Sequence, residues 1–64
     1  DRISHATMTI MRIAVYEMMY ADDVPAAAAI NEAVELAKKY DHENAPAFVN
    51  GILNRIAHEK GLLQ

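Results

Sequence analysis

The chain has 64 residues, of which 53% are hydrophobic, and its six basic and nine acidic side chains give a net charge of −3. A chain this short forms one domain at most, and the absence of cysteine excludes disulfides and thiolate metal sites. No apolar run approaches the roughly 20 residues of a membrane span, and no basic-then-apolar leader opens the sequence. We therefore expect a soluble cytoplasmic protein whose acidic balance disfavours extensive phosphate binding.

The spacing of apolar residues predicts a first helix over 7–20, with the hydroxyl of Thr7 as its N-terminal cap. Ile10 and Ile13 fall on one face of this helix. Four methionines and Val15 form a second apolar face. A helix that is apolar around most of its circumference is expected to lie centrally in the fold.

A second helix is predicted over 25–40, after the break "ADDVP". Pro25 suits the start of a helix, and it disfavours helical geometry at the residue before it. The apolar stripe that follows consists mostly of alanine. Small side chains on this stripe allow a neighbouring helix to approach closely.

A third helix is predicted over 45–60, after the break "DHEN". Asn44 is a suitable N-terminal cap, and Gly61 is placed as the left-handed residue that ends the helix. Leu62 is expected to fold back over the last turn. Both ends of the third helix are therefore specified by the sequence.

Asn50 and Gly51 form a dipeptide that is typical of a β-hairpin turn. The apolar residues around it, however, recur at helical spacing, which favours a continuous helix. A glycine inside a helix costs about 1 kcal/mol relative to alanine, so it usually has a packing reason. We expect Gly51 to face the first or second helix in a close crossing.

The stretch "IMRIAVYEMMYADDVPAAAAINEAVELAKKYDHENAPAFVNGILNRIA" resembles the C-terminal half of the NusB family of transcription antitermination factors. The resemblance rests on an R-[ILV]-A-x-Y-E helix, then D-V-P, then I-N-E-A-V-E-L-A-K, then F-V-N-G-[IV]-L. It implies an all-α fold, here a three-helix bundle that corresponds to the C-terminal half of a NusB-like helical domain and lacks the N-terminal half.

The resemblance also implies a function and partners. Members of the family bind the boxA element of nascent RNA together with a small-subunit ribosomal protein, called NusE in this role. Within the antitermination complex on RNA polymerase, they suppress termination in ribosomal RNA operons. Much of the cationic RNA surface belongs to the N-terminal part of the family, which fits the acidic balance found here.

Arg12 and Phe48 match positions that the family associates with RNA, and Asn44, at the N-terminus of the third helix, is the third candidate RNA-binding residue. An exposed arginine can bind phosphate or bases, an aromatic ring can stack on unpaired bases, and a helix N-terminus attracts phosphate. Each also has a purely structural interpretation: Arg12 as a solvated surface residue, Asn44 as a helix cap and Phe48 as a core residue. Ala47 stands where the family often has lysine, which removes one expected phosphate contact. Pro25, Gly51 and Gly61 are expected to be structural.

No catalytic constellation, glycine-rich phosphate loop or cofactor motif is present, and the three histidines lack the spacing of a metal site. We therefore expect no enzyme activity, cofactor or metal. One alternative is the NusB-like RNA-binding domain of a ribosomal RNA cytosine-5 methyltransferase, although the glycine of "FVNG" favours the antitermination factor. Another is a general helical adaptor protein. Because so short a chain forms a small core, we also expect it to be marginally stable alone or completed by a second copy, as a homodimer or a domain-exchanged assembly.

Overall fold

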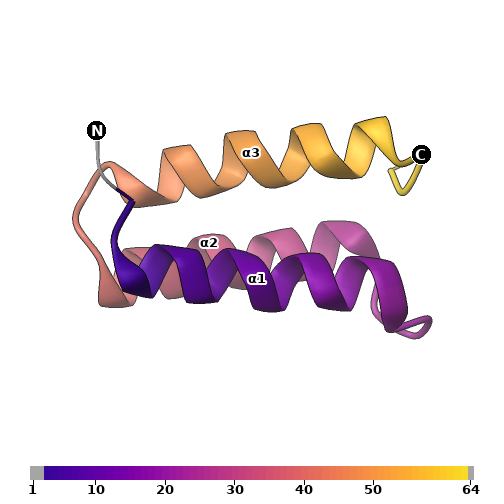
Figure 1. The fold of residues 1–64 in the computed structure, drawn as a ribbon, viewed down its shortest axis with the longest axis horizontal. Coiled ribbons are helices and arrows are strands. Elements are labelled where there is room, and N and C mark those ends of the chain that lie inside the picture. The colour runs from indigo at the N-terminus through magenta and orange to yellow at the C-terminus, as the bar shows by residue number, and fades with distance from the viewer. Residues whose placement is uncertain (1–2, 64) are drawn as a thin grey trace.

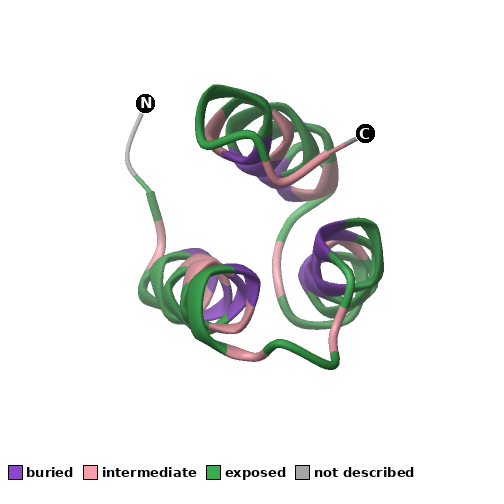
Figure 2. Ribbon diagram, turned by 90° about the vertical axis from the view of Figure 1, so that its right-hand side faces the viewer, coloured by how far each residue is buried: buried purple, intermediate pink, exposed green. Residues whose placement is uncertain are grey.

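The computed structural model describes residues 3–63, which form three helices: α1 (His5–Tyr20), α2 (Ala26–Tyr40) and α3 (Ala45–Glu59). The helices α1 and α3 run in the same direction and α2 runs in the opposite one (Figure 1). Seen end on, the buried residues of all three helices face a common centre (Figure 2). The prediction of an all-α three-helix bundle is therefore confirmed. None of the helices within residues 3–63 is long and apolar enough to cross a membrane.

The helix α1 begins two residues earlier than predicted, and its cap is Ser4 rather than Thr7. The Ser4 hydroxyl accepts a hydrogen bond of 3.1 Å from the backbone N–H of Thr7, as an N-cap residue does. Thr7 lies in the first helical turn and is buried. Its hydroxyl donates a hydrogen bond to Asp41, 34 residues further along the chain. The prediction of Thr7 as the cap was wrong because Thr7 lies inside the first helical turn, whereas Ser4 is the extended residue that precedes the helix.

The other two helices begin where the sequence predicts, within one residue. Pro25 occupies the cap position of α2 with a φ of −62°, and its carbonyl accepts hydrogen bonds from Ala28 and Ala29. Asn44 occupies the cap position of α3, but its side chain makes no capping hydrogen bond. Its backbone is already in the helical region, whereas a capping side chain needs an extended residue at this position. The capping role predicted for the Asn44 side chain was therefore wrong.

The end of α3 follows the prediction closely. Gly61 has a φ of +70°, in the left-handed region. The N–H of Gly61 donates to the carbonyl of His58 at 3.1 Å, and that of Leu62 to the carbonyl of Ala57 at 2.8 Å. This pair of bonds is the Schellman motif, in which glycine reverses the chain after a helix. Leu62 then packs against the core as expected.

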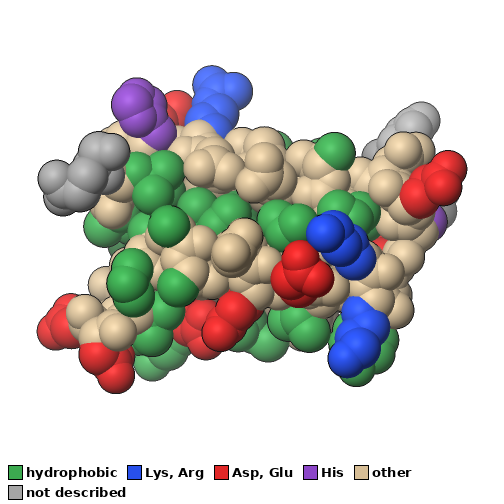
Figure 3. All heavy atoms as spheres, turned by 180° about the vertical axis from the view of Figure 1, so that it is seen from behind, with side chains coloured by type: hydrophobic (Ala, Val, Ile, Leu, Met, Phe, Trp, Pro, Cys, Tyr) green, Lys and Arg blue, Asp and Glu red, His purple; other side chains and the backbone are tan. Residues whose placement is uncertain are grey.

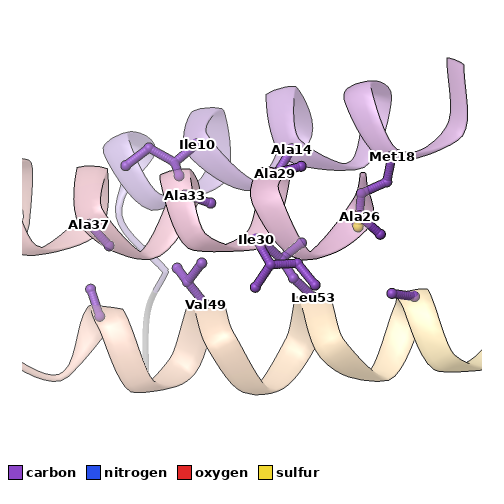
Figure 4. Close-up of a cluster of buried hydrophobic side chains, with 12 residues drawn as sticks. Ile10, Ala14, Met18, Ala26, Ala29, Ile30, Ala33, Ala37, Val49 and Leu53 are labelled. Carbon is purple, nitrogen blue, oxygen red and sulfur yellow. The ribbon is translucent and has the colours of Figure 1, made fainter. Parts of the chain in front are cut away.

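Among residues 3–63, the core contains twelve buried apolar residues, of which seven are alanines and five have large side chains. The five are Ile10, Met18, Ile30, Val49 and Leu53. Side chains from all three helices meet between the ribbons (Figure 4). Alanine brings the helices close together but buries little apolar area per residue, so this core provides limited hydrophobic stabilisation.

The expected central position of α1 is not found. Ile10, Ala14 and Met18 point into the core, but Met8, Ile13 and Met19 are exposed. With only two other helices in the bundle, α1 has one side covered and its remaining apolar sides open. Apolar surface therefore remains on both flanks of this helix.

Gly51 does not face a neighbouring helix. It lies within α3, so the helix is continuous through Asn50 and Gly51 and the hairpin alternative is excluded. The residue is exposed, and a Cβ built on it would meet no atom within 4 Å. The predicted close crossing at Gly51 was therefore wrong, because the core stripe of α3 passes through Val49 and Leu53 on the other side of the helix.

Candidate nucleic-acid interface

A hollow of about 230 Å³ lies where the first turns of α1 and α3 meet the loop between α2 and α3. It contains two of the residues predicted to bind RNA, Asn44 and Phe48. Its other lining residues are Ile3, Ser4, Thr7, His42 and Ala45. An aromatic ring beside amide, imidazole and hydroxyl groups can stack on a nucleobase and hydrogen-bond to its edge.

Phe48 is the main apolar group of this hollow, and its side chain is not in the core. It is 41% exposed, whereas Val49 beside it is fully buried. The core stripe of α3 follows Ala45, Val49, Leu53 and Ala57, and Phe48 lies to one side of that stripe. Its ring is therefore accessible for stacking, and the interpretation of Phe48 as a core residue was wrong.

A largely covered carboxylate, that of Asp41, is bonded to three of the residues that line this hollow. Asp41 ends α2, and only 9% of its side chain is exposed. One carboxylate oxygen accepts hydrogen bonds from the hydroxyls of Ser4 and Thr7, and the other accepts the backbone N–H of His42 at 2.8 Å. These bonds join the start of α1 to the end of α2, so the two sides of the hollow are held in place.

The same bonds determine the charge of Asp41. Hydrogen bonds from Ser4, then Thr7, then the backbone of His42 lower the pKa of the carboxyl from 3.8 to about 2, because they favour its charged form. Asp41 is therefore negatively charged at neutral pH. Since its lone pairs face the protein's own donors, it is a structural group and not a ligand for a cation.

The start of α3 offers fewer free amides than the sequence suggests. The N–H of Ala45 donates to the carbonyl of His42 at 3.1 Å, and that of Phe48 donates to Asn44 at 3.3 Å. Pro46 has no N–H at all. Little beyond the amide of Ala47 is left for an anion, so the helix terminus alone forms a weak phosphate site.

Arg12 does not line this hollow. It is exposed on α1 and lies at a second depression, the apolar groove, which runs between α1 and α3. The apolar groove is also lined by Met8, Met11, Val15, Tyr16, Ile52 and Ile56. Phe48 and Ile52 are one helical turn apart on α3, so the hollow and the groove follow each other along the same side of the bundle. The structure thus brings Asn44 and Phe48 together and places Arg12 further along that side.

The opposite side of the bundle, over α2 and α3, carries charged side chains of both signs, unlike the side with the hollow and the apolar groove. Figure 3 shows lysine and arginine side chains interspersed there with aspartate and glutamate. One such pair is Lys38 and Glu35, whose charged atoms lie 3.2 Å apart. Alternating charges give no concentrated positive potential for a phosphate chain.

A further depression, between α1 and α2, combines apolar and acidic side chains. Ile13 and Leu36 are exposed apolar residues in it, and the carboxylates of Glu17 and Glu32 lie beside them. An apolar centre with acidic side chains is suited to a basic protein surface. The sequence alone did not reveal this juxtaposition, because the residues come from two helices and are spaced without a motif.

The fold and these surfaces define a class of protein: a small all-α bundle with no group of three or more metal-ligating side chains in residues 3–63, and with an exposed aromatic hollow at one end. Comparison with known proteins gives the family, because the model of the NusB family matches residues 1–58. This chain belongs to the NusB family.

Relatives in several bacteria support this assignment. The chain is 52% identical over 56 residues to the "Transcription antitermination protein NusB" of Clostridium novyi, covering 88% of this chain and 42% of the relative. It is 52% identical over 61 residues to the protein of that name in Desulfosudis oleivorans, covering 95% of this chain and 40% of the relative. The protein of that name in Bacillus velezensis is also 52% identical over 56 residues, covering 88% of this chain and 43% of the relative. No solved structure matches the chain. The chain thus spans about two-fifths of the length of these relatives.

Proposed function

We propose that this chain takes part in transcription antitermination, by binding boxA RNA of nascent transcripts together with a small-subunit ribosomal protein of the NusE type. In this role it would help to suppress termination in ribosomal RNA operons. The relatives named above carry the antitermination name. The observation that carries the proposal is the exposed ring of Phe48, which lies in a hollow with Asn44 at the position of the F-V-N-G motif.

The RNA would lie along the side that carries the hollow and Arg12. Phe48 would stack on an unpaired base, and the side-chain amide of Asn44 would form a hydrogen bond with the edge of that base. Arg12 would neutralise a phosphate further along the strand. No carboxylate among residues 3–63 forms an ion pair with it, so its charge is available to a ligand.

The ribosomal protein would bind elsewhere, on the surface between α1 and α2. Proteins that bind ribosomal RNA are generally rich in lysine and arginine, and the carboxylates of Glu17 and Glu32 are complementary to such a partner. Ile13 and Leu36 would provide apolar contact at the centre. RNA and protein partner would thus occupy different sides of α1.

The proposal is tested by the affinity of the chain for a labelled boxA RNA in the presence of the ribosomal protein, measured by fluorescence anisotropy at low salt. Removal of the ring in Phe48→Ala is expected to weaken binding roughly 5- to 150-fold, since stacking on one base contributes about 1–3 kcal/mol. Tyr40→Ala removes an aromatic ring that is more exposed than Phe48, 64% against 41%, from the end of α2 outside the hollow, and is expected to have little effect.

The possible results separate two kinds of failure. If the unmodified chain binds boxA RNA no better than a scrambled RNA of the same length, the proposed function is wrong. If it binds boxA RNA specifically but Phe48→Ala and Tyr40→Ala weaken binding equally, the function stands and the hollow is not the site.

A further inference from the structure

One exposed face of α3 continues beyond the hollow. Phe48, Gly51 and Arg55 follow one another at intervals of three and four residues, so they lie on the same face of the helix. Asn44 begins this face, and all four residues are exposed. Arg55 lies about 10 Å further along the helix axis than Phe48, since each residue of a helix adds about 1.5 Å. The face therefore extends the hollow along α3.

Gly51 leaves a bare stretch of backbone on this face. A Cβ built on Gly51 would meet no atom within 4 Å, so packing within residues 3–63 does not explain the glycine. The residue nevertheless makes the helix less stable than alanine would. A helix surface without a side chain lets another molecule approach the backbone closely. The glycine thus favours a ligand that lies flat against α3, next to the ring of Phe48.

Arg55 provides the positive charge of this face. Its side chain is 78% exposed, and its Nε donates a hydrogen bond of 3.2 Å to the carboxylate of Glu59. Within residues 3–63, its two terminal amino groups donate no hydrogen bond to another residue. A guanidinium that is held through Nε still presents these two groups to a phosphate. Glu59 therefore orients the guanidinium and leaves its phosphate-binding end free.

The distribution of carboxylates also favours an anion along α3. No aspartate or glutamate occurs in the sequence between Glu43 and Glu59, so this helix carries no negative side chain beside the hollow or beside Gly51. On α2, by contrast, carboxylates and cations alternate, as in the pair of Lys38 and Glu35 (Figure 3). A phosphate chain therefore meets less repulsion along α3 than along α2.

We propose that the RNA-binding surface continues from the hollow along this face of α3. The inference rests on the proposed function and adds two residues to it. The nucleotide that stacks on Phe48 continues with its sugar and phosphate against the bare backbone at Gly51. Arg55 binds a phosphate further along the strand through its terminal amino groups. Arg12 contacts the same strand from α1.

The first part of the test fills the bare stretch. Gly51→Leu places a side chain on the proposed path of the RNA. Asn50→Leu places the same side chain on an exposed residue that is two positions after Phe48 and so faces away from it. We expect Gly51→Leu to weaken the binding of labelled boxA RNA, in the presence of the ribosomal protein, roughly fivefold or more, because the RNA is pushed away from the helix. Asn50→Leu is expected to change the affinity by less than about twofold.

The second part of the test removes the charge. Arg55→Gln and Lys39→Gln each remove one positive charge, the first from α3 and the second from the exposed surface of α2. For single-stranded RNA, the slope of log K against log salt concentration decreases by about 0.7 for each phosphate contact that is lost. We expect this decrease for Arg55→Gln and an unchanged slope for Lys39→Gln.

The results separate this inference from the proposed function. If the unmodified chain does not distinguish boxA RNA from a scrambled RNA, both are wrong. If it binds boxA RNA specifically and Phe48→Ala weakens binding, but Gly51→Leu or Arg55→Gln gives the same result as its control, the function stands and the inference is wrong.

Two further measurements keep the test decisive. Circular dichroism shows whether each variant is folded, and if Gly51→Leu is not, the salt dependence of Arg55→Gln decides alone, because that side chain is exposed. Binding of the ribosomal protein is also measured without RNA. If Gly51→Leu weakens this binding, the face of α3 is a protein-binding surface and the inference is wrong.

Discussion

Gly51 is a single residue whose backbone works against the stability of this chain. It lies in the middle of α3, where glycine is less favourable than alanine because it loses more conformational freedom on folding. No atom lies within 4 Å of the position that a Cβ would take. Space for a side chain is therefore available, and nothing within residues 3–63 requires its absence.

Gly51→Ala is expected to raise the free energy of unfolding of this chain by about 1 kcal/mol, which is the difference in helix propensity between the two residues. Urea denaturation followed by circular dichroism measures the change. Gly51→Leu should also be tolerated, contrary to the expectation from the sequence, because the added atoms point away from the core. A loss of stability in Gly51→Ala would contradict the exposed position described here.

Asp41 provides a second prediction at this scale, in the dependence of stability on pH. The pKa of Asp41 is about 2 in the folded chain, whereas its ordinary value is 3.8. At a pH between these two values the unfolded chain therefore binds more protons than the folded chain. The stabilisation of the fold by the charged Asp41 carboxylate is fully present above about pH 4 and is lost as the pH falls toward 2. Asp41→Asn should lower the Tm at pH 6 and flatten the decrease in Tm between pH 4 and pH 2. An unchanged acid slope in Asp41→Asn would contradict the role of this carboxylate.

The sequence predicted the elements well, because their limits depend on local chemistry. Pro25 begins α2 and Gly61 ends α3 wherever the rest of the chain lies. The contacts of Ser4 and Thr7 could not be predicted in the same way. Both hydroxyls donate to Asp41, which lies more than 30 residues away, and no local pattern in the sequence indicates that contact.

The end of α3 gives a prediction at the scale of the element. Gly61→Ala puts a Cβ on a residue with a φ of +70°, where a residue with a side chain is strained by roughly 1–2 kcal/mol. We expect a loss of stability of about that size and fraying of the last turn, including the bond between Leu62 and Ala57. Amide hydrogen exchange measures this fraying. Equal protection of the Leu62 amide in both proteins would show that glycine is not needed there.

At the scale of the whole molecule, the packing of three helices determines which predicted site residues come together. Asn44 and Phe48 are close in sequence, so their meeting at one hollow follows from the start of α3. The exposure of Phe48 does not follow from the sequence, because it is one of several apolar residues at helical spacing in α3. Only the direction from which α1 and α2 approach makes Val49 and Leu53 the core and leaves Phe48 outside.

The same packing explains why Arg12 lies apart from these two residues. It is exposed on α1, but nothing in the sequence gives its position relative to α3. It lies beside the apolar groove, one or two turns further along the bundle than the hollow. An RNA strand that contacts both the hollow and Arg12 must therefore extend along the side of the molecule between α1 and α3.

The most direct test of this account is a map of the RNA contact on the folded chain. The chain labelled with ¹⁵N is titrated with boxA RNA in the presence of the ribosomal protein, and the amide shifts that depend on RNA are recorded by NMR. We predict that the largest shifts occur at the start of α3, around Asn44 and Phe48, and near Arg12 on α1, with α2 nearly unaffected between Asn31 and Lys39. Shifts centred on that segment of α2, or no difference between boxA and a scrambled RNA, would contradict the account.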